Sequence, residues 1–356
     1  MNVLELARQG AWQDLEDVWP HAHVMKQCVQ DAEYHAEGDV WRHTQMVRAA
    51  LNTCDLMFVA AALYHDVAKP QTRIEVTSDG VTHVSHPNHS KLGAHVWWQD
   101  SSQMSELSAA QRAYVWFLIR YHQRPFHAWK QSDMMRFMAH LAVDVNIYHL
   151  IDFAQADNQG RQSVHQTHTQ EQLHLLQEWC NEHDMFSMFH SDHHRVTYFE
   201  NAHRQIDYVP PDPQGSRVML MSGLPGSGKD THIQTTYPHT PVVSLDDIRR
   251  TLKVDPTDNQ GAVIQAAQEL ARKYLRTQTT FVWNATCVTR LQRQKIIQLC
   301  RSYDAHVSIC EMTTPWNVCV HRNQHRVHSV PVPILRRMLH KQEPVSLTEC
   351  HSLIRI

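Results

Sequence analysis

The chain has 356 residues, of which 42% are hydrophobic, so it can bury a large core, and its length favours two domains over one. This composition excludes a wholly disordered chain, and the longest apolar run, at residues 56–64, is too short to cross a bilayer. Because the N-terminal segment lacks the apolar core of a signal peptide and the eight cysteines form no CxxC pair, we expect a soluble, cytoplasmic protein with free thiols and no membrane partner.

The formal net charge of −3 is distributed unevenly. Residues 1–215 hold 15 Lys and Arg against 26 Asp and Glu, whereas residues 216–356 hold 18 against 10. The asymmetry predicts two domains with different partners and makes the basic part the better candidate for binding a polyanion such as nucleic acid. Of the 29 histidines, 21 lie in the acidic part, which is consistent with a metal site but also with scattered surface histidines.

The predicted N-terminal domain, residues 1–165, is all-α. Its apolar residues recur at helical spacing, for example over 40–51 and 111–122, with little of the alternation typical of strands. The following residues, 166–215, are polar and His-rich and contain one helical stretch at 169–180. We expect them to form a connector that ends in a linker.

The predicted C-terminal domain, residues 216–356, has a different pattern. Short apolar segments alternate with amphipathic helices, and this alternation predicts a doubly wound, mostly parallel α/β sheet. The predicted strands are residues 217–222, 241–245, 279–284 and 306–312.

A phosphate-binding loop follows the first predicted strand. Residues 223–230, GLPGSGKD, fit the pattern GxxxxGK[ST] except at the last position. In such a loop, backbone N–H groups point at phosphate oxygens and the next helix adds its dipole, while Lys229 would contact the β- and γ-phosphates. The predicted nucleotide-binding residues are Gly223, Gly226, Ser227, Gly228, Lys229, Asp230 and Thr231.

Asp230 stands where the pattern has a serine or threonine, whose hydroxyl contacts Mg²⁺. A carboxylate is itself a hard oxygen ligand, and its charge beside a triphosphate requires a nearby cation. Adenylate-kinase-like loops similarly lack this hydroxyl and keep the following threonine. We therefore expect a working kinase with Mg²⁺ held near Asp230 or Thr231, and lost metal binding is the alternative.

The segment 243–252, VSLDDIRRTL, places two carboxylates and an arginine at the end of the second strand, where open α/β sheets bind ligands. A carboxylate there can accept the proton of an acceptor hydroxyl, a role typically worth roughly 10²- to 10⁴-fold in rate. Aspartate also caps helices well, so one of Asp246 and Asp247 could act as the base and the other as the cap.

These motifs resemble those of the phage-type 5′-hydroxyl polynucleotide kinases: a GxPGSGKS-type loop, a DDxR segment, a strand ending in an Asp/Asn-x-Thr/Asn turn, and an arginine-bearing lid. The resemblance covers about residues 217–350, with a lid-like segment at 315–338 and with Asp230 and Asn284 as the main departures. It implies ATP or GTP with Mg²⁺ as the donor. It implies Asp246 as the general base, Arg249 as a contact to the acceptor phosphate, and Arg326 with Arg322 as the arginines that grip the donor phosphates; a solvated helix face is the alternative for the last two.

The acidic part contains a set of metal-ligand residue types. His65 and Asp66 follow the apolar residues 56–62, so a largely buried helix would deliver them into the interior, where charge needs a metal or a partner. Lys69 is either a contact to substrate phosphate or a plain surface lysine. The predicted ligands are His43, His65, Asp66, His89, His122 and Asp157, with His86 as the alternative to His89; His83, His127, His140 and His149 are assigned to no site, and the His-rich segment 190–199 is expected to pack as a connector rather than to bind metal.

The order H…HD…H…H…D over about residues 30–161 resembles that of the HD-superfamily phosphohydrolases, and residues 36–44, AEGDVWRHT, resemble the HD domains attached to tRNA nucleotidyltransferases. The resemblance implies that the first His, the HD pair and the last Asp hold one metal, and that the other histidines let a second bind with Asp66 between the two. Two close cations can activate a water for hydrolysis of a phosphate ester. One or two divalent transition metals (Mn, Ni, Co, Fe or Zn) are implied.

An HD phosphohydrolase ahead of a polynucleotide kinase is similar to the bacterial HD-Pnk family of RNA end-healing enzymes. The resemblance implies hydrolysis of 2′,3′-cyclic phosphate or 2′/3′-phosphate ends by the first domain and NTP-dependent phosphorylation of 5′-hydroxyl RNA or DNA ends by the second, with a nucleic acid ligase acting downstream. A small-molecule or nucleotide kinase joined to an HD nucleotide phosphohydrolase is an alternative. A non-catalytic RNA-binding switch that depends on NTP and metal is another.

Overall fold

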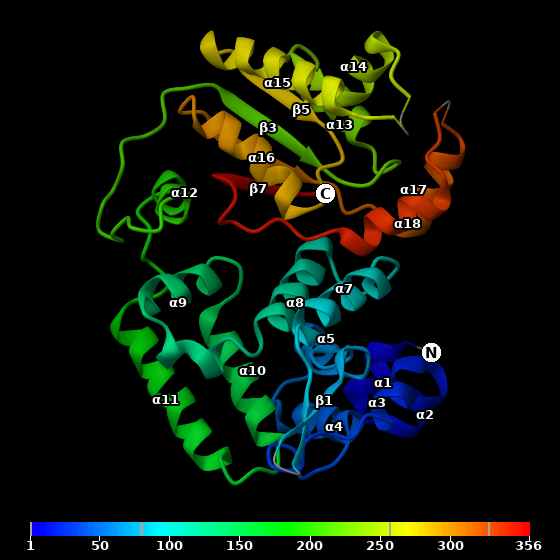
Figure 1. The fold of residues 1–356 in the computed structure, drawn as a ribbon, viewed down its shortest axis with the longest axis vertical. Coiled ribbons are helices and arrows are strands. Elements are labelled where there is room, and N and C mark those ends of the chain that lie inside the picture. Colours follow the sequence, from blue (N-terminus) through cyan, green and yellow to red (C-terminus); the bar gives the residue numbers. More distant parts are fainter. Residues whose placement is uncertain (1, 79–80, 256–257, 327) are drawn as a thin grey trace. The chain divides into compact units, whose positions relative to one another are not determined.

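The structure is a computed structural model that divides into two compact units, Met1–Met188 and Phe189–Ile356, each of which is described by itself (Figure 1). The expected boundaries at residues 165 and 216 remain predictions, because the segment between them contributes one helix to each unit. Among the described residues, no helix is both long and apolar enough to span a bilayer. The eight cysteines are free, as expected. The structure describes residues 2–78, 81–255, 258–326 and 328–356.

The first unit is mainly helical. Aspartate side chains cap two helices next to candidate site residues. At the start of α4, Asp39 accepts a hydrogen bond from the backbone N–H of Arg42, and at the start of α5, Asp55 accepts one from that of Met57. The helices are α1 (Val3–Gln9), α2 (Trp12–Val18), α3 (Pro20–Lys26), α4 (Val40–Ala50), α5 (Leu56–Tyr64), α6 (Lys69–Thr72), α7 (His89–Ser101), α8 (Ala109–Tyr121), the 3₁₀ helix η1 (Pro125–Lys130), α9 (Met134–Ala142), α10 (Ile147–Gln159) and α11 (Gln166–Glu182).

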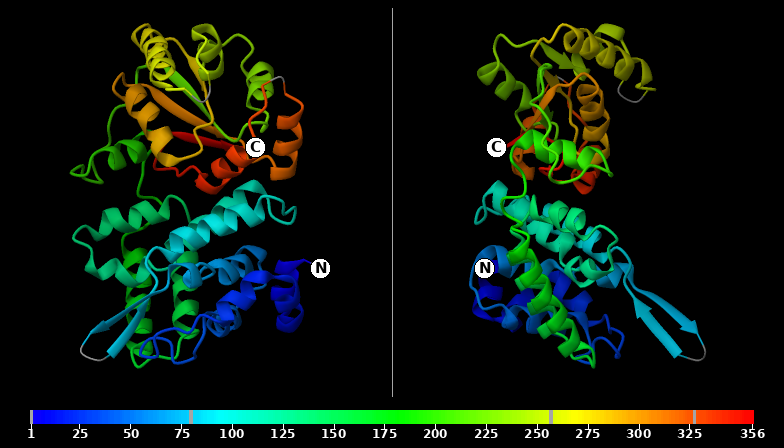
Figure 2. Two further views of the ribbon diagram at one scale, coloured as in Figure 1. Left: turned by 45° about the vertical axis from the view of Figure 1, so that its right-hand side comes forward. Right: turned by 90° about the vertical axis from the view of Figure 1, so that its left-hand side faces the viewer.

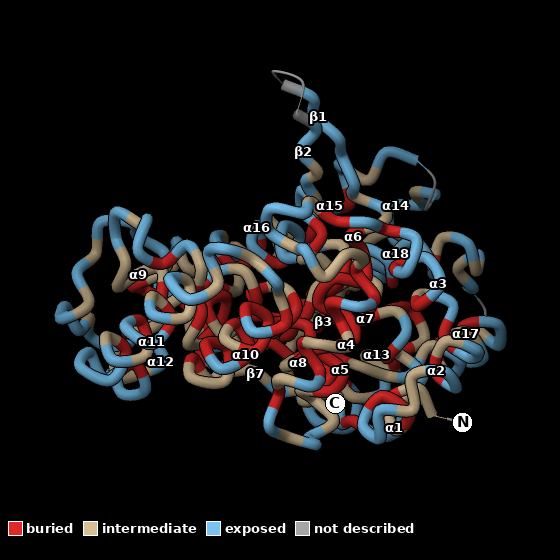
Figure 3. Tube along the Cα trace, turned by 90° about the horizontal axis from the view of Figure 1, so that it is seen from below, coloured by how far each residue is buried: buried red, intermediate tan, exposed pale blue. Residues whose placement is uncertain are grey.

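Helix α5 runs through the interior of this unit. Its residues from Val59 to Tyr64 are all buried, as expected of a helix that is apolar on every side (Figure 3). The C-terminal end of α10 lies directly against α4: a Cβ atom on Gly160 would be 2.6 Å from Val47 Cγ2 and 2.8 Å from Val47 N. Only glycine permits this approach, which brings the two helices that carry His43 and Asp157 together.

The all-α prediction is wrong at one place, an antiparallel hairpin of β1 (Ile74–Ser78) and β2 (Val81–Ser85). Figure 2 shows it extending away from the helices of its unit, and its described residues are mostly exposed. Both strands are rich in β-branched residues and flank the dipeptide Asp79-Gly80, a known hairpin signal that lies outside the described residues. The helical periodicity of the residues on either side led us to overlook this short alternation of apolar and polar residues.

The second unit contains a five-stranded sheet in which every pairing is parallel, with the order β4-β5-β3-β6-β7. The chain fills one side of β3 with β4 and β5 and then the other side with β6 and β7, which is the doubly wound arrangement. Four of the strands are the predicted ones, whereas β7 was missed because its segment is short and none of its residues is buried. The strands are β3 (Arg217–Ser222), β4 (Val242–Ser244), β5 (Phe281–Asn284), β6 (His306–Glu311) and β7 (Ser352–Arg355).

Helices connect these strands, and one further helix, α12 (Asp192–Glu200), precedes the sheet in the chain. Arg195 of α12 donates hydrogen bonds to the backbone carbonyls of Leu347, Cys350 and His351, so this helix packs on the segment that leads into β7. The remaining helices are α13 (Lys229–Thr236), α14 (Leu245–Leu252), α15 (Gly261–Arg276), α16 (Arg290–Arg301), α17 (Trp316–Gln324) and α18 (Val332–Lys341).

Candidate functional site

Five separate elements of the first unit bring the six predicted ligands together in its interior. His43 lies in α4, His65 and Asp66 follow α5, His89 begins α7, His122 follows α8, and Asp157 lies near the end of α10. All six are buried, with exposed fractions between 0% and 4%. We refer to them as the HD cluster: His43, His65, Asp66, His89, His122 and Asp157.

Asp66 lies at the centre of the HD cluster. Its Oδ2 is 3.2 Å from His65 Nε2 and 3.6 Å from His43 Nε2, and its Oδ1 is 3.2 Å from His89 Nε2 and 3.8 Å from His122 Nε2. The ligand atoms therefore form two groups that share this carboxylate, each with its atoms within 4.8 Å of one another. Such an arrangement could hold two cations bridged by one carboxylate.

The histidine rings are oriented by backbone carbonyls. Nδ1 of His65 lies 2.8 Å from Ala62 O, and Nδ1 of His122 lies 2.8 Å from Ile119 O. A ring that donates from Nδ1 presents the lone pair of Nε2, which is the usual second contact of a metal-bound histidine. Nε2 of His65 and Oδ1 of Asp66 are buried, and among the described residues their 3.2 Å contacts within the cluster are ion-pair contacts without hydrogen-bond geometry. The donor set and these unsatisfied atoms fit a divalent transition metal.

The charges of the two carboxylates and of His122 suit ligand roles. Burial alone would raise the pKa of Asp66, but His65 and Lys69 hold it well below its usual range. Asp157 behaves likewise: burial alone would raise its pKa, but Arg161 and His43 together lower it. Burial and the neighbouring His65 lower the pKa of His122 to about 3. The carboxylates are therefore anionic and His122 is neutral at physiological pH. Burial lowers the pKa of His43, but Asp157 and Glu37 outweigh burial and raise it, so this histidine must release a proton when a metal binds.

Lys69 is not a surface lysine. It is buried, and its Nζ lies 2.8 Å from Asp66 Oδ2 and 2.6 Å from Gln30 Oε1. Nδ1 of His86 contacts the backbone carbonyl of Lys69 at 2.9 Å, and this histidine belongs to neither group around Asp66. The interior position of Lys69 leaves the contact to substrate phosphate as its predicted role.

The sequence reasoning missed Glu37, which lies behind His43. Glu37 Oε1 is 2.7 Å from His35 Nδ1 and 3.1 Å from His43 Nδ1, while Oε2 accepts a 2.8 Å hydrogen bond from Gln162 N. Burial opposes its charge, yet the two histidines lower its pKa. The only sequence signal was a carboxylate six residues before a predicted ligand. It also missed Arg161, which pairs with both carboxylate oxygens of Asp157 at 3.2 and 2.6 Å.

In the second unit, the phosphate loop lies between β3 and α13, and Lys229 is the first residue of that helix. Lys229 Nζ donates to the backbone carbonyls of Gly223 and Leu224, both at 2.9 Å. Gly226 and Gly228 have φ angles of +81° and +93°, which favour glycine. Burial lowers the pKa of Lys229 to about 8, although the Asp230 carboxylate acts in the opposite direction. The loop is therefore already folded around its lysine.

Helix α17, which begins the predicted lid, packs against this loop. A Cβ atom on Gly226 would lie only 2.4 Å from the carbonyl oxygen of Cys319. A Cβ atom on Gly228 would lie 3.4 Å from a guanidinium nitrogen of Arg322. Arg326 is close enough to lower the pKa of Lys229. Both predicted lid arginines thus face the phosphate loop, although Val327 of the lid segment lies outside the described residues.

Helix α14 follows β4, the predicted second strand. Its cap is Ser244, whose hydroxyl accepts a 3.2 Å hydrogen bond from Asp247 N, so the prediction that one aspartate is the cap is wrong. The serine already occupies the capping position, which places both aspartates within the first turn. Asp246 pairs with Arg249, and it also raises the pKa of Lys229, so it lies near the phosphate loop.

Asp230 and Asn284 contact each other directly. Asn284 Nδ2, at the end of β5, donates a 2.7 Å hydrogen bond to Asp230 Oδ1. β5 pairs with β3, so the ends of the two strands lie side by side (Figure 1). With the hydroxyl of Thr231 next to Asp230 in the chain, this edge of the sheet offers the hard oxygen donors that Mg²⁺ prefers.

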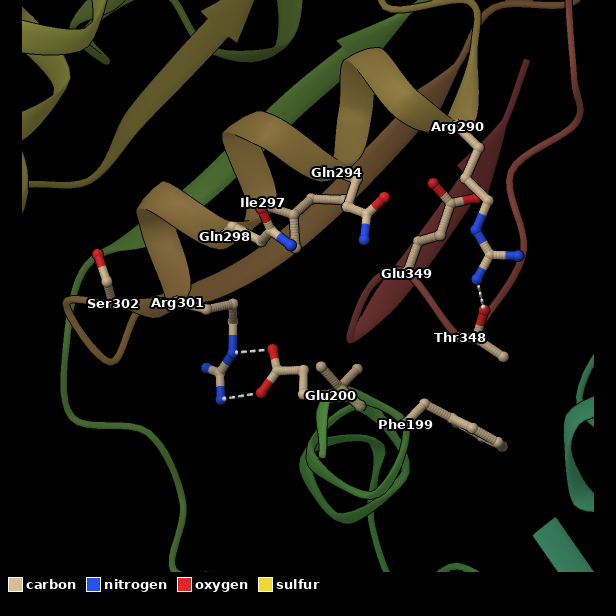
Figure 4. A pocket seen from close by; sticks show the side chains of 11 residues that line it. Phe199, Glu200, Arg290, Gln294, Ile297, Gln298, Arg301, Ser302, Thr348 and Glu349 are labelled. Carbon is tan, nitrogen blue, oxygen red and sulfur yellow. Dashed lines mark hydrogen bonds and ion pairs between the residues drawn. The ribbon is translucent and has the colours of Figure 1, made fainter. Parts of the chain in front are cut away.

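A separate pocket of about 410 Å³ lies along α16 (Figure 4). Arg301 and Glu200 form an ion pair at one end of it, and Arg290 contacts Thr348 at the other. None of the predicted site residues lines it. Glu200 pairs with Arg301, and Glu349 pairs with the buried Arg293, which does not line the pocket. We therefore take the phosphate loop as the candidate nucleotide site.

The comparison with known proteins concerns the second unit. Residues 218–345 match the model of a protein family described as an AAA domain. A search of curated proteins finds no match to the chain. The matched segment contains the phosphate loop, α14, the end of β5 and the lid segment. The second unit therefore contains a P-loop domain of nucleotide-kinase type, which indicates an enzyme that binds a nucleotide with Mg²⁺.

Proposed function

We propose that the protein heals nucleic acid ends. Its P-loop domain would phosphorylate 5′-hydroxyl ends, and its first unit would hydrolyse 2′,3′-cyclic phosphate or 2′/3′-phosphate ends. The observation that carries the proposal is the convergence of the four histidines of the HD cluster on Asp66 in a chain that also carries a P-loop kinase-type domain. The excess of basic residues after residue 215 favours a polynucleotide over a small molecule as the kinase acceptor.

In the first unit, the HD cluster would hold one or two divalent transition metals. When bound, these cations would lower the pKa of a water and neutralise charge on the phosphate ester. The chain's own residues would set the geometry: Nδ1 contacts fix the imidazoles, and Glu37 orients His43. The ammonium of Lys69, which pairs with Asp66, would contact a phosphate oxygen of the substrate.

In the second unit, Lys229 and Arg326 would hold the nucleotide phosphates, and Arg322 would lie beside them. Asp246 would accept the proton of the 5′-hydroxyl as its oxygen bonds to the γ-phosphorus, and the nucleoside diphosphate would leave on the opposite side. Asp246 has 59% of its side-chain surface exposed, so an acceptor can reach it. Arg249, now paired with Asp246, would turn to the phosphate of the acceptor strand.

The test uses an RNA with a 5′-hydroxyl and a 2′,3′-cyclic phosphate, incubated with Mg²⁺, Mn²⁺ or Ni²⁺ and a labelled NTP. Two pairs of variants provide matched controls. Asp246→Ala is compared with Asp247→Ala, which lies in the same helix and pairs with Arg250 instead. Asp157→Asn is compared with Asp152→Asn in the same helix α10.

We expect Asp246→Ala to abolish labelling of the 5′ end and Asp157→Asn to abolish loss of the cyclic phosphate, with each variant keeping the other activity. Both control variants should retain both activities. If neither RNA end changes while free nucleotides or small molecules are phosphorylated or hydrolysed, the nucleic acid proposal fails. Nucleotide binding without any turnover would point to a non-catalytic switch.

A further inference from the structure

The contact between Asp230 and Asn284 joins the two positions at which the site departs from the Mg²⁺-binding pattern of P-loop NTPases. P-loop NTPases hold Mg²⁺ with a Ser or Thr hydroxyl after the loop lysine and with an aspartate from the end of a neighbouring strand. Here the carboxylate follows Lys229 and the neutral side chain ends β5. Although 54 positions apart in the chain, the two side chains are 2.7 Å apart at their nearest polar atoms.

The two departures compensate each other electrostatically. The usual pair is a hydroxyl and a carboxylate, and the pair present here is a carboxylate and an amide. Each pair carries one negative charge. Two carboxylates about 4 Å apart would repel each other by about 4 kcal/mol at the effective dielectric constant typical of a protein surface. A carboxylate at 230 therefore matches an amide at 284, and the amide N–H group orients it through the hydrogen bond.

Each side chain keeps an oxygen outside this hydrogen bond. Among the described residues, Asp230 Oδ2 and Asn284 Oδ1 have no recorded hydrogen-bond partner. Asp230 lies in the first turn of α13, directly after the phosphate loop, and Asn284 lies at the carboxyl end of β5, the strand next to β3. The β- and γ-phosphates would lie at this edge of the sheet.

We propose that Asp230 and Asn284 form an exchanged Mg²⁺ site, in which the carboxylate has moved from the strand end to the phosphate loop, and that Asp230 rather than Thr231 is the protein ligand. The inference rests on the proposed kinase function of the second unit and names the residues that hold its metal. It predicts that Mg²⁺ binding survives when Asp230→Ser and Asn284→Asp are combined but not when either substitution is made alone.

The experiment measures nucleotide binding to the full chain by calorimetry, with and without Mg²⁺, using a non-hydrolysable ATP analogue and no acceptor. The quantity compared is the ratio of the two affinities, and Mn²⁺ electron paramagnetic resonance gives a second readout of the bound metal. The variants are Asp230→Ser, Asn284→Asp and the double variant. Thr231→Val tests the competing ligand, and Asp247→Ser is a control for loss of a nearby carboxylate.

We expect Asp230→Ser to reduce the Mg²⁺-dependent ratio at least about tenfold, because the site then offers a hydroxyl and an amide but no carboxylate. Asn284→Asp should weaken binding of the Mg²⁺-free nucleotide, because two carboxylates then face the triphosphate. The double variant should return the ratio to within about threefold of the parent, and Thr231→Val should leave it within the same range.

Two results would overturn the inference: a double variant that is no better than Asp230→Ser, or a ratio that falls with Thr231→Val and not with Asp230→Ser. These results leave the proposed function standing, because the parent protein still binds nucleotide with Mg²⁺. A parent that phosphorylates no RNA end but shows the predicted recovery in the double variant would refute the proposed acceptor and support the exchanged site.

Discussion

Replacing Asp66 by asparagine tests the HD cluster most directly, because the change removes one negative charge and almost no volume. Lys69 is 4% exposed, and its ammonium lies 2.8 Å from the Asp66 carboxylate. Removing one member of a buried ion pair typically costs about 3–5 kcal/mol, since the other charge stays buried. Gln30 still accepts a hydrogen bond from Lys69, so we expect a loss near the lower limit, about 3 kcal/mol.

The loss depends on pH in a defined direction. The folded-state pKa of Asp66 is lowered well below its usual value, so its stabilising effect is complete above the unfolded-state value of about 3.9 and is lost as the pH falls through the folded-state value. At pH 7.5 the full difference between parent and variant should therefore be measured.

The assay is urea unfolding of the metal-free full chain, followed by tryptophan fluorescence. Eight of the ten tryptophans lie in residues 1–188, so the signal reports mainly on the first unit. With a urea dependence of about 2 kcal/mol/M, the midpoint should fall by about 1.5 M. The double variant Asp66→Asn/Lys69→Met should recover most of this loss, because it no longer buries an unpaired ammonium.

Metal binding provides the second half of this test. Asp66→Asn and the double variant should both bind Mn²⁺ at least about 100-fold more weakly than the parent, because even residues behind metal ligands change affinity by 10- to 100-fold. A single variant as stable as the parent would refute the argument about the buried ion pair. Unchanged metal affinity would refute the central role of Asp66.

Three further predictions concern residues around the two sites. Glu37→Gln should lower Mn²⁺ affinity about 10- to 100-fold in calorimetry, because His43 Nδ1 loses its carboxylate contact at 3.1 Å. Nucleotide affinity should fall above pH 8, by up to about tenfold per pH unit, as Lys229 loses its proton at a pKa of about 8, and the profile of Lys229→Gln should be weak and flat. Gly226→Ala should lower nucleotide affinity by at least about tenfold in the same assay, because its Cβ would lie 2.4 Å from the carbonyl oxygen of Cys319 and displace α17.

Each of these has a control within the chain. Glu75→Gln changes an exposed glutamate in β1 and should leave Mn²⁺ affinity unchanged; equal losses in both variants would contradict the positioning role. A nucleotide affinity that stays constant to pH 9.5 would contradict the lowered pKa of Lys229. Gly38→Ala has the same kind of positive φ, +110°, but no atom within 4 Å of its Cβ, so it should not change nucleotide binding. Parent-like nucleotide affinity in Gly226→Ala would show that α17 does not depend on this contact.

Local patterns in the sequence were sufficient to predict the sheet of the second unit and its phosphate loop. Buried parallel strands appear as short apolar runs, and a phosphate loop needs glycines and a lysine at fixed spacing, so both features are properties of neighbouring residues. The strand β3 and the loop after it were predicted in this way. The hairpin β1–β2 was also encoded locally, but its short alternation lay between strong helical patterns.

Other features depend on contacts between residues far apart in the chain, which local periodicity does not specify. The burial of Lys69 against Asp66 follows from the packing of α5 among its neighbours, and the contact of Asp230 with Asn284 follows from the pairing of β3 with β5. The position of Glu37 behind His43 likewise exists only after folding. Amino-acid types and spacing therefore determined which residues could act together, whereas tertiary packing decided their distances, their charges and their partners.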